Sequence, residues 1–214
     1  MEHDFWHQRW QTNQIGFHLP EANPLLVKHF PRLKLASGAR IFLPLCGKTE
    51  DIPWLLSQGY RVAGSELSPI AIEDLFIRLQ LKPVISSHDG LIHYSAPNID
   101  IYVGDIFKLT KRQLGNVDAV YDRAALVALP ENIRIQYTAH LMTLTRTAPQ
   151  LLICFEHDQA IHAGPPFSVT ASEVNQHYEH IYTLKLLETI AMADGLKGKY
   201  PATEQVWLLS SGKM

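Results

Sequence analysis

Residues 40–68 constrain the fold more than any other part of the sequence. They begin with a short apolar run, 41–45, of the kind found in strands that are buried on both faces. A turn containing Gly47 follows, and then a segment with apolar side chains at helical spacing, which Gly59 ends. A second apolar run leads to Glu66. This order predicts a βαβ unit with an acid about 20 residues beyond the glycine turn.

A βαβ unit of this layout binds the adenosine part of a cofactor, because the acid accepts hydrogen bonds from ribose hydroxyls. The turn at residues 46–48 has one glycine, whereas a dinucleotide-binding turn has three. Without those glycines a pyrophosphate cannot approach the helix N-terminus closely. A nucleoside cofactor without phosphate fits better, and S-adenosylmethionine is the obvious candidate. An ordinary α/β unit with Glu66 at its surface stays open as the alternative.

Composition narrows the class of protein. The chain has 214 residues, of which 46% are hydrophobic, and no linker or repeat interrupts it, so we expect one domain. The net charge is -2, so nucleic acid is not expected as a partner. We find no apolar run that could cross a bilayer and no secretion signal at the N-terminus. Two cysteines, Cys46 and Cys154, do not form a disulfide framework, which favours a reducing cytoplasm.

Beyond residue 68 apolar runs continue to alternate with helical segments. The runs 99–104, 117–121 and 150–155 are predicted as strands. Residues 84–95 contain Asp89-Gly90 between two alternating pieces, which indicates a hairpin inserted before the third core strand. Two alternating segments close the chain as an antiparallel pair. This order predicts a mostly parallel sheet with helices on both faces.

The segment 1–35 precedes the first core strand and is rich in aromatic side chains. Trp6 and Trp10 are four residues apart and share a helix face, and Asn23-Pro24 begins a second helix. Such a segment either packs apolar surface against the sheet or forms a lid over a cofactor. In a lid, an indole that faces a sulfonium cation attracts it by about 0.5–2 kcal/mol. The two interpretations are compatible.

Charged residues also follow two later strands. Asp105 comes just after the strand 99–104, where its carboxylate can accept a hydrogen bond from an adenine amino group while Ile106 packs on the ring. The alternative is that Asp105 caps a turn. Arg123 follows the strand 117–121, and its planar fork can bind the carboxylate of a methionine moiety or of an acidic substrate. The alternative is a surface ion pair, which contributes little.

Taken together, these motifs resemble the bacterial thiopurine S-methyltransferases, within the class I S-adenosylmethionine-dependent methyltransferases. The resemblance spans nearly the whole chain. It is carried by Phe5-Trp6 to Trp10 with Ile15-Gly16-Phe17-His18, Leu43-Pro44-Leu45-Cys46-Gly47-Lys48, Gly64-Ser65-Glu66-Leu67-Ser68, Gly104-Asp105-Ile106-Phe107, and Tyr121-Asp122-Arg123-Ala124-Ala125-Leu126. It implies an α/β, Rossmann-like fold with a mostly parallel seven-stranded sheet, helices on both faces and an N-terminal helical lid at residues 1–35.

The resemblance also implies a function. It implies methyl transfer from S-adenosyl-L-methionine to the sulfur of aromatic or heterocyclic thiols such as thiopurines, with selenium or tellurium compounds as further acceptors. We further expect a cytoplasmic monomer that needs no metal, no membrane and no nucleic acid. The cofactor contacts that the resemblance implies are Trp10, Leu45, Glu66, Asp105, Ile106 and Arg123. Phe17 is implied as the residue that touches the acceptor, and residues 197–201 yield no aligned acceptor contact.

Methyl transfer to sulfur requires two positioned reactants and a dry site more than a strong base, because a heteroaromatic thiol is already acidic. The sequence contains no obvious catalytic dyad, and we predict no catalytic side chain. A second hypothesis is a metal-dependent enzyme that uses His157, Asp158 and His162, although their spacing matches no common signature. A third is a non-catalytic module that binds a nucleoside without turnover.

Overall fold

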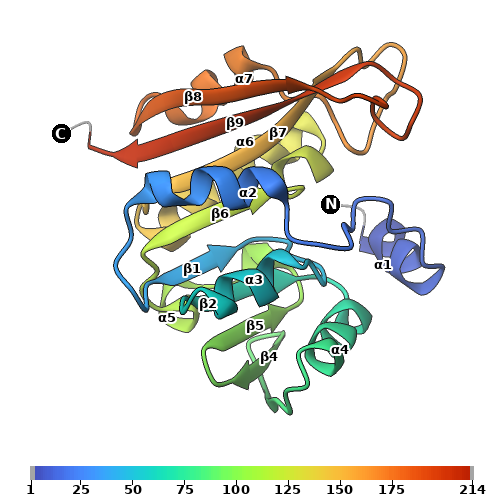
Figure 1. The fold of residues 1–214 in the computed structure, drawn as a ribbon. Helices are drawn as coiled ribbons and strands as arrows, with labels where there is room; N and C mark the ends of the chain where they lie inside the picture. Colours follow the sequence, from blue (N-terminus) through green and yellow to red (C-terminus); the bar gives the residue numbers. More distant parts are fainter. Residues whose placement is uncertain (1–2, 213–214) are drawn as a thin grey trace.

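The computed structural model describes residues 3–212, whose strands form one mixed sheet (Figure 1). The order across the sheet is β3-β4-β5-β2-β1-β6-β7-β9-β8. The strands are β1 (Arg40–Leu43), β2 (Arg61–Glu66), β3 (Val84–His88), β4 (Leu91–Ala96), β5 (Ile99–Val103), β6 (Ala119–Arg123), β7 (Gln150–His157), β8 (Tyr182–Ala191) and β9 (Ala202–Ser211).

Helices cover both faces of this sheet and bury a separate core on each (Figure 1). One face carries α2 (Pro24–His29), η1 (Phe30–Leu33), α3 (Asp51–Ser57) and α4 (Pro69–Arg78). The other face carries η2 (Ile106–Lys108), α5 (Lys111–Leu114), η3 (Leu126–Ala128), α6 (Glu131–Thr145) and α7 (Ala171–Tyr178). Helix α1 (His3–Gln11) lies beside α4, away from both cores. Within residues 3–212, no helix has the length and apolar character that a bilayer crossing requires.

The central strands run parallel, so their carboxyl ends meet at one edge of the sheet. Strand β1 pairs with β2 and β6, β2 pairs with β5, and β6 pairs with β7, all in parallel register. Strand β9 then inserts antiparallel between β7 and β8. The turn after β1, Glu66 of β2 and Arg123 of β6 therefore come to the same edge, as ligand sites of open α/β sheets do.

The predicted α/β fold with helices on both faces is confirmed, but the predicted count of seven strands is wrong. The Asp89-Gly90 hairpin forms as expected, and its strands join the sheet instead of standing apart as an insertion. Strand β4 pairs antiparallel with β5 through residues 92–96, so it satisfies backbone groups that the edge of a seven-stranded sheet would leave open. Strand β3 becomes the new edge, and Val84 and Ile85 on it are exposed.

Two element boundaries also differ from the sequence predictions. Strand β6 starts two residues later than predicted and ends on Arg123, so this side chain belongs to the last residue of the strand. The short helix α5 is not predicted from the sequence, because its four residues are too few to show a helical period. Thr110 and Gln113 form a capping box around α5, which is the local signal that marks it.

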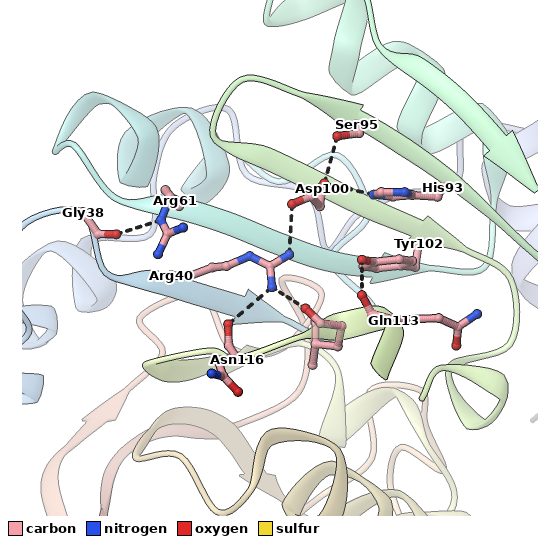
Figure 2. Close-up of polar contacts among 10 residues, drawn as sticks. Gly38, Arg40, Arg61, His93, Ser95, Asp100, Tyr102, Gln113 and Asn116 are labelled. Carbon is pink, nitrogen blue, oxygen red and sulfur yellow. Dashed lines mark hydrogen bonds and ion pairs between the residues drawn. The ribbon is translucent and has the colours of Figure 1, made fainter. Parts of the chain in front are cut away.

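A polar network around Asp100 of β5 lies at the amino ends of the parallel strands, away from the end where Glu66 and Arg123 meet (Figure 2). The Asp100 carboxylate accepts hydrogen bonds from His93 Nε2 and Ser95 Oγ of β4, each at 2.9 Å. Its other oxygen accepts from Arg40 Nη2 of β1, also at 2.9 Å. Arg40 Nη1 in turn donates to the carbonyl oxygen of Leu114, at the end of α5. One carboxylate thus ties the added hairpin to β5 and β1.

Candidate functional site

Two backbone N–H groups of the turn after β1 donate hydrogen bonds to the end of β2. Cys46 N–H donates to the carbonyl oxygen of Ser65 at 2.8 Å, and Gly47 N–H donates to Glu66 Oε2 at 2.8 Å. Leu45 has a φ of 46°, in the left-handed region that a residue with a side chain rarely adopts. The backbone therefore bends sharply at Leu45, and strained positions of this kind gather at ligand sites.

Glu66 is 5% exposed, and both of its carboxylate oxygens accept a backbone N–H. Ser68 N–H donates to Oε1 and Gly47 N–H to Oε2, each at 2.8 Å. Burial raises the pKa of Glu66, and these backbone N–H groups act in the opposite direction. Each oxygen keeps the capacity to accept a second hydrogen bond, as the hydroxyls of a ribose would offer. The position of Glu66 at the end of β2 is as predicted.

An aromatic cluster from the N-terminal segment lies over this turn. A Cβ atom built on Gly47 would stand 3.0 Å from Trp10 Cζ2, so the indole lies against the backbone at the one glycine of the turn. The Trp10 and Phe17 rings meet edge to face with centroids 5.5 Å apart, and Trp6 meets Phe17 at 6.0 Å. Because glycine has no Cβ, the Trp10 ring can lie directly against the backbone of this turn.

The two helices of the predicted lid segment differ in their packing. Leu25 and Leu26 of α2 belong to the core on one face of the sheet, so α2 is a structural helix. Helix α1 contributes to neither core cluster among residues 3–212, and its contacts include α4, the turn after β1, and Asp105, whose Oδ2 is 3.8 Å from His3 Nε2. Helix α1 and the loop that follows it line the cavity described below, and their role as a lid remains a prediction.

Arg123 reaches from the end of β6 to that loop. Its Nη1 donates to the carbonyl oxygen of Phe17 at 2.9 Å. Its Nε is buried and has no hydrogen-bond partner among the described residues. Ala124 has a φ of 63°, so the backbone turns away directly after Arg123. An unpartnered buried guanidinium N–H is a group that a ligand carboxylate would satisfy.

A cavity of about 740 Å³ opens between these elements, a size typical of small-molecule sites. Five of the seven residues predicted to bind cofactor or acceptor line it, namely Trp10, Phe17, Leu45, Glu66 and Arg123. The remaining wall includes Phe155 of β7, Pro165 and Pro166 of the following loop, and Leu196 before β9. The wall is mainly apolar, and two of its charged side chains, Glu66 and Arg123, come from the carboxyl ends of β2 and β6.

Asp105 and Ile106 do not line this cavity. Asp105 Oδ1 accepts a hydrogen bond from Phe107 N–H at 3.0 Å and caps η2, which is the alternative stated for it above. Ile106 is 1% exposed and belongs to the core on the α6 face. Their contact with a cofactor remains a prediction.

The polar residues of the cavity wall that are not predicted as site residues from the sequence include Asp51, Tyr121 and Glu204. Tyr121 O–H donates to Asp51 Oδ2 at 3.1 Å, and Asn23 N–H donates to Asp51 Oδ1 at 2.7 Å. Burial raises the pKa of Tyr121 well above its ordinary value, so the phenol stays a donor. The available signal was strand alternation, which places Tyr121 on the same face of β6 as Arg123.

The residues of the metal hypothesis are engaged in other contacts. Asp158 Oδ1 accepts a hydrogen bond from Ala160 N–H, and His157 Nε2 is 3.1 Å from the carbonyl oxygen of Pro166. The His162 ring stacks on Tyr200 with centroids 5.0 Å apart. Across residues 3–212, no group of three or more His, Cys, Asp or Glu side chains is arranged to hold a metal ion. The metal hypothesis is therefore not supported.

Comparison with known proteins decides the family. The model of the family described as thiopurine S-methyltransferase (TPMT) matches residues 1–207. The chain belongs to the thiopurine S-methyltransferase family. A thiopurine S-methyltransferase of Xanthobacter autotrophicus is 57% identical over 210 residues, which cover 98% of this chain and 99% of the relative. One of Acinetobacter baylyi is 49% identical over 216 residues and covers 99% of each chain. The resemblance found in the sequence is confirmed.

Solved structures show the same fold at low identity. A Burkholderia thailandensis 1,6-didemethyltoxoflavin-N1-methyltransferase, solved with that compound and S-adenosylhomocysteine, matches with a TM-score of 0.67 at 14% identity. The match covers 98% of this chain and 87% of the other. An Anabaena variabilis S-adenosylmethionine-dependent methyltransferase has a TM-score of 0.63 at 17% identity over 98% and 95%. These likenesses confirm the class I methyltransferase fold for this member of the thiopurine S-methyltransferase family.

Proposed function

We propose that this protein transfers a methyl group from S-adenosyl-L-methionine to the sulfur of aromatic or heterocyclic thiols such as thiopurines. The observation that carries the proposal is the link from the turn after β1 to Glu66, in a largely apolar cavity lined by aromatic rings. Membership of the thiopurine S-methyltransferase family supports an enzyme and not a non-catalytic nucleoside-binding module.

The cofactor fits the polar groups of the cavity. Glu66 keeps acceptor capacity for two ribose hydroxyls, and Leu45 and Trp10 supply the apolar wall beside it. Arg123 Nε is an unpartnered buried donor that suits the carboxylate of the methionine moiety. When bound, S-adenosylmethionine supplies an electrophilic methyl group on a sulfonium. Asp105 and Ile106 stay in the proposal as adenine contacts, although they do not line the cavity.

The acceptor side suits a flat ring with an anionic or acidic sulfur. Phe17, Phe155 and Pro165 offer apolar surface to an aromatic ring. Arg9 and Lys197 line the same cavity and favour an acceptor that carries negative charge. Selenium or tellurium compounds belong to the proposed acceptors, because their anions are nucleophiles of the same kind as thiolates.

We propose that residues 1–214 act as one domain, with α1 and the loop after it as the lid. The packing of α1 outside both cores supports this assignment. We also propose a monomer in the cytoplasm, consistent with the buried and unpaired thiols of Cys46 and Cys154. Burial raises the pKa of both thiols, which disfavours a nucleophilic role for Cys46.

A panel of acceptors with methyl-labelled S-adenosylmethionine tests the proposal. Heteroaromatic thiols, aliphatic thiols, selenols, selenite and tellurite are incubated with the enzyme, and labelled product is counted. We expect the highest kcat/KM with heteroaromatic thiols, and we expect the rate to survive dialysis against a chelator. Tight S-adenosylhomocysteine binding with no product from any acceptor would instead point to the non-catalytic module.

A further inference from the structure

Three carboxylates line the cavity, and two of them are already occupied. Glu66 accepts the N–H groups of Gly47 and Ser68. Asp51 accepts the backbone N–H of Asn23 on one oxygen and the Tyr121 hydroxyl on the other. Both side chains are almost completely buried, with exposed fractions of 5% and 1%. Each oxygen of these two carboxylates already accepts a hydrogen bond, so a proton taken from an acceptor would compete with an existing donor.

The third carboxylate, Glu204, is different. It lies near the start of β9, paired with Phe155 of β7 and Ile190 of β8, and it is partly buried. Within residues 3–212 its side chain accepts no hydrogen bond that meets normal geometry, and no cation lies within 4 Å of it. Burial raises the pKa of Glu204, and the positive charge of Arg123 acts in the opposite direction. A carboxylate that is partly withdrawn from water and without a partner in a cavity is a candidate for proton transfer.

The other titratable groups of the cavity are less suited to this task. His18 Nε2 accepts from Arg78 Nη1 at 3.3 Å, so that ring lone pair is in use, and burial with the nearby cations lowers its pKa. Tyr121 is a hydrogen-bond donor to Asp51. The remaining charged side chains of the wall, Arg9, Lys48, Arg123 and Lys197, are cations.

We propose that Glu204 is the general base that takes up the proton of the methyl acceptor; this inference rests on the proposed function. A neutral thiol carries its proton on sulfur, and a heteroaromatic thione carries it on a ring nitrogen. In the step, this S–H or N–H bond breaks and the proton moves to a Glu204 carboxylate oxygen. The electron pair released makes the acceptor sulfur nucleophilic, and this sulfur forms a new S–CH₃ bond. The bond between the methyl carbon and the donor's sulfonium sulfur breaks, and its electron pair stays on that sulfur, which becomes a neutral thioether. Glu204 then returns the proton to solvent.

The cavity wall supports this assignment through charge as well as position. Arg123 lies close enough to Glu204 to influence its charge state, and both side chains face the cavity from neighbouring parts of the sheet edge. An acceptor held between them would have a cation beside its developing negative charge and a base for its proton. The sequence gives no sign of this pair, since the two residues are far apart in the chain.

The test compares two arenethiol acceptors at one pH, using Glu204→Gln. One acceptor has a thiol pKa below the assay pH and arrives ionised, and the other has a pKa well above it and arrives protonated. We expect Glu204→Gln to lose at least about tenfold in kcat/KM with the protonated acceptor, since general bases typically contribute 10²–10⁴-fold. With the ionised acceptor we expect the wild-type rate or a higher one, because a negative charge has been removed. Glu204→Asp should recover part of the lost rate.

A matched control is a substitution on the neighbouring strand. Glu156 of β7 does not line the cavity, and its Oε2 accepts a hydrogen bond from Gln205 Nε2. Glu156→Gln makes the same change of charge and should leave both rates at the wild-type level. Calorimetric titration with S-adenosylhomocysteine shows whether each variant keeps a folded cofactor site, and we expect wild-type affinity in all three.

Two results would overturn the proposal. An equal loss with both acceptors in Glu204→Gln would show that Glu204 positions the acceptor and does not take its proton. Full activity of Glu204→Gln with the protonated acceptor would show that proton removal does not use Glu204. Failure of the proposed function has a different signature, because the wild-type protein itself would then methylate neither acceptor.

Discussion

At the scale of single residues, Glu66 joins two roles that substitution can separate. Its oxygens hold the backbone of Gly47 and Ser68, and they retain acceptor capacity for a ligand. We expect Glu66→Gln to weaken S-adenosylhomocysteine binding by about 1.5–3 kcal/mol, because a charged acceptor is lost. Glu66→Ala should also lower the free energy of unfolding, because two buried N–H groups lose their partner.

Calorimetric titration measures the affinity, and urea unfolding measures the stability of the same samples. Glu131→Gln, at an exposed position in the first turn of α6, serves as the control. Unchanged affinity in Glu66→Gln would remove this carboxylate from the cofactor site.

Arg123 offers a second prediction at this scale. The unpartnered Nε and the Phe17 contact both depend on a planar fork, which lysine lacks. We expect Arg123→Lys to lower kcat/KM by more than tenfold, or about 1.4 kcal/mol of transition-state stabilisation. Initial rates with a heteroaromatic thiol at saturating cofactor check this, with the exposed Arg112→Lys as the control. Full activity in Arg123→Ala would contradict a role in either cofactor or acceptor binding.

At the scale of elements, the added hairpin depends on Asp100. Burial alone would raise the pKa of Asp100, but hydrogen bonds from Ser95 and His93 and the charge of Arg40 outweigh it and lower the pKa below its ordinary value of 3.8. A lowered folded pKa means that the carboxylate stabilises the fold above the unfolded pKa. That contribution is lost as the pH falls through the lower, folded pKa.

We therefore expect Asp100→Asn to lower the free energy of unfolding by about 1–3 kcal/mol at pH 7. The difference from wild type should shrink as the pH is lowered below about 4. Urea unfolding at several pH values measures it. Asp89→Asn is the matched control, because the exposed turn position at φ 53° accepts asparagine. A difference that stays constant with pH would show that the ionised carboxylate does not carry the effect.

At the scale of the whole molecule, the sequence predicts what depends on local pattern. The buried run at 41–45, the turn at Gly47 and the acid at 66 lie within one βαβ unit, and the structure forms it. Contacts between distant segments have no such local pattern. The addition of β3 and β4 to the sheet edge depends on how β5 is left exposed, and Glu204 reaches the cavity only because β9 inserts beside β7.

The last prediction concerns how α1 is coupled to the rest of the chain. Because α1 lies outside both core clusters of residues 3–212, removal of residues 1–15 should change the unfolding temperature of the free protein little. The stabilisation that bound S-adenosylhomocysteine adds should differ more between the full and the shortened chain. At 100 times Kd, S-adenosylhomocysteine adds about 2.7 kcal/mol, or roughly 5–10 °C for a chain of this size. If the lid contributes a tenfold gain in affinity, the shortened chain gains only about 1.4 kcal/mol at the same concentration. Thermal unfolding with and without S-adenosylhomocysteine distinguishes these cases. An equal shift in both chains, together with equal turnover, would show that α1 packs beside the cavity without closing over the ligand.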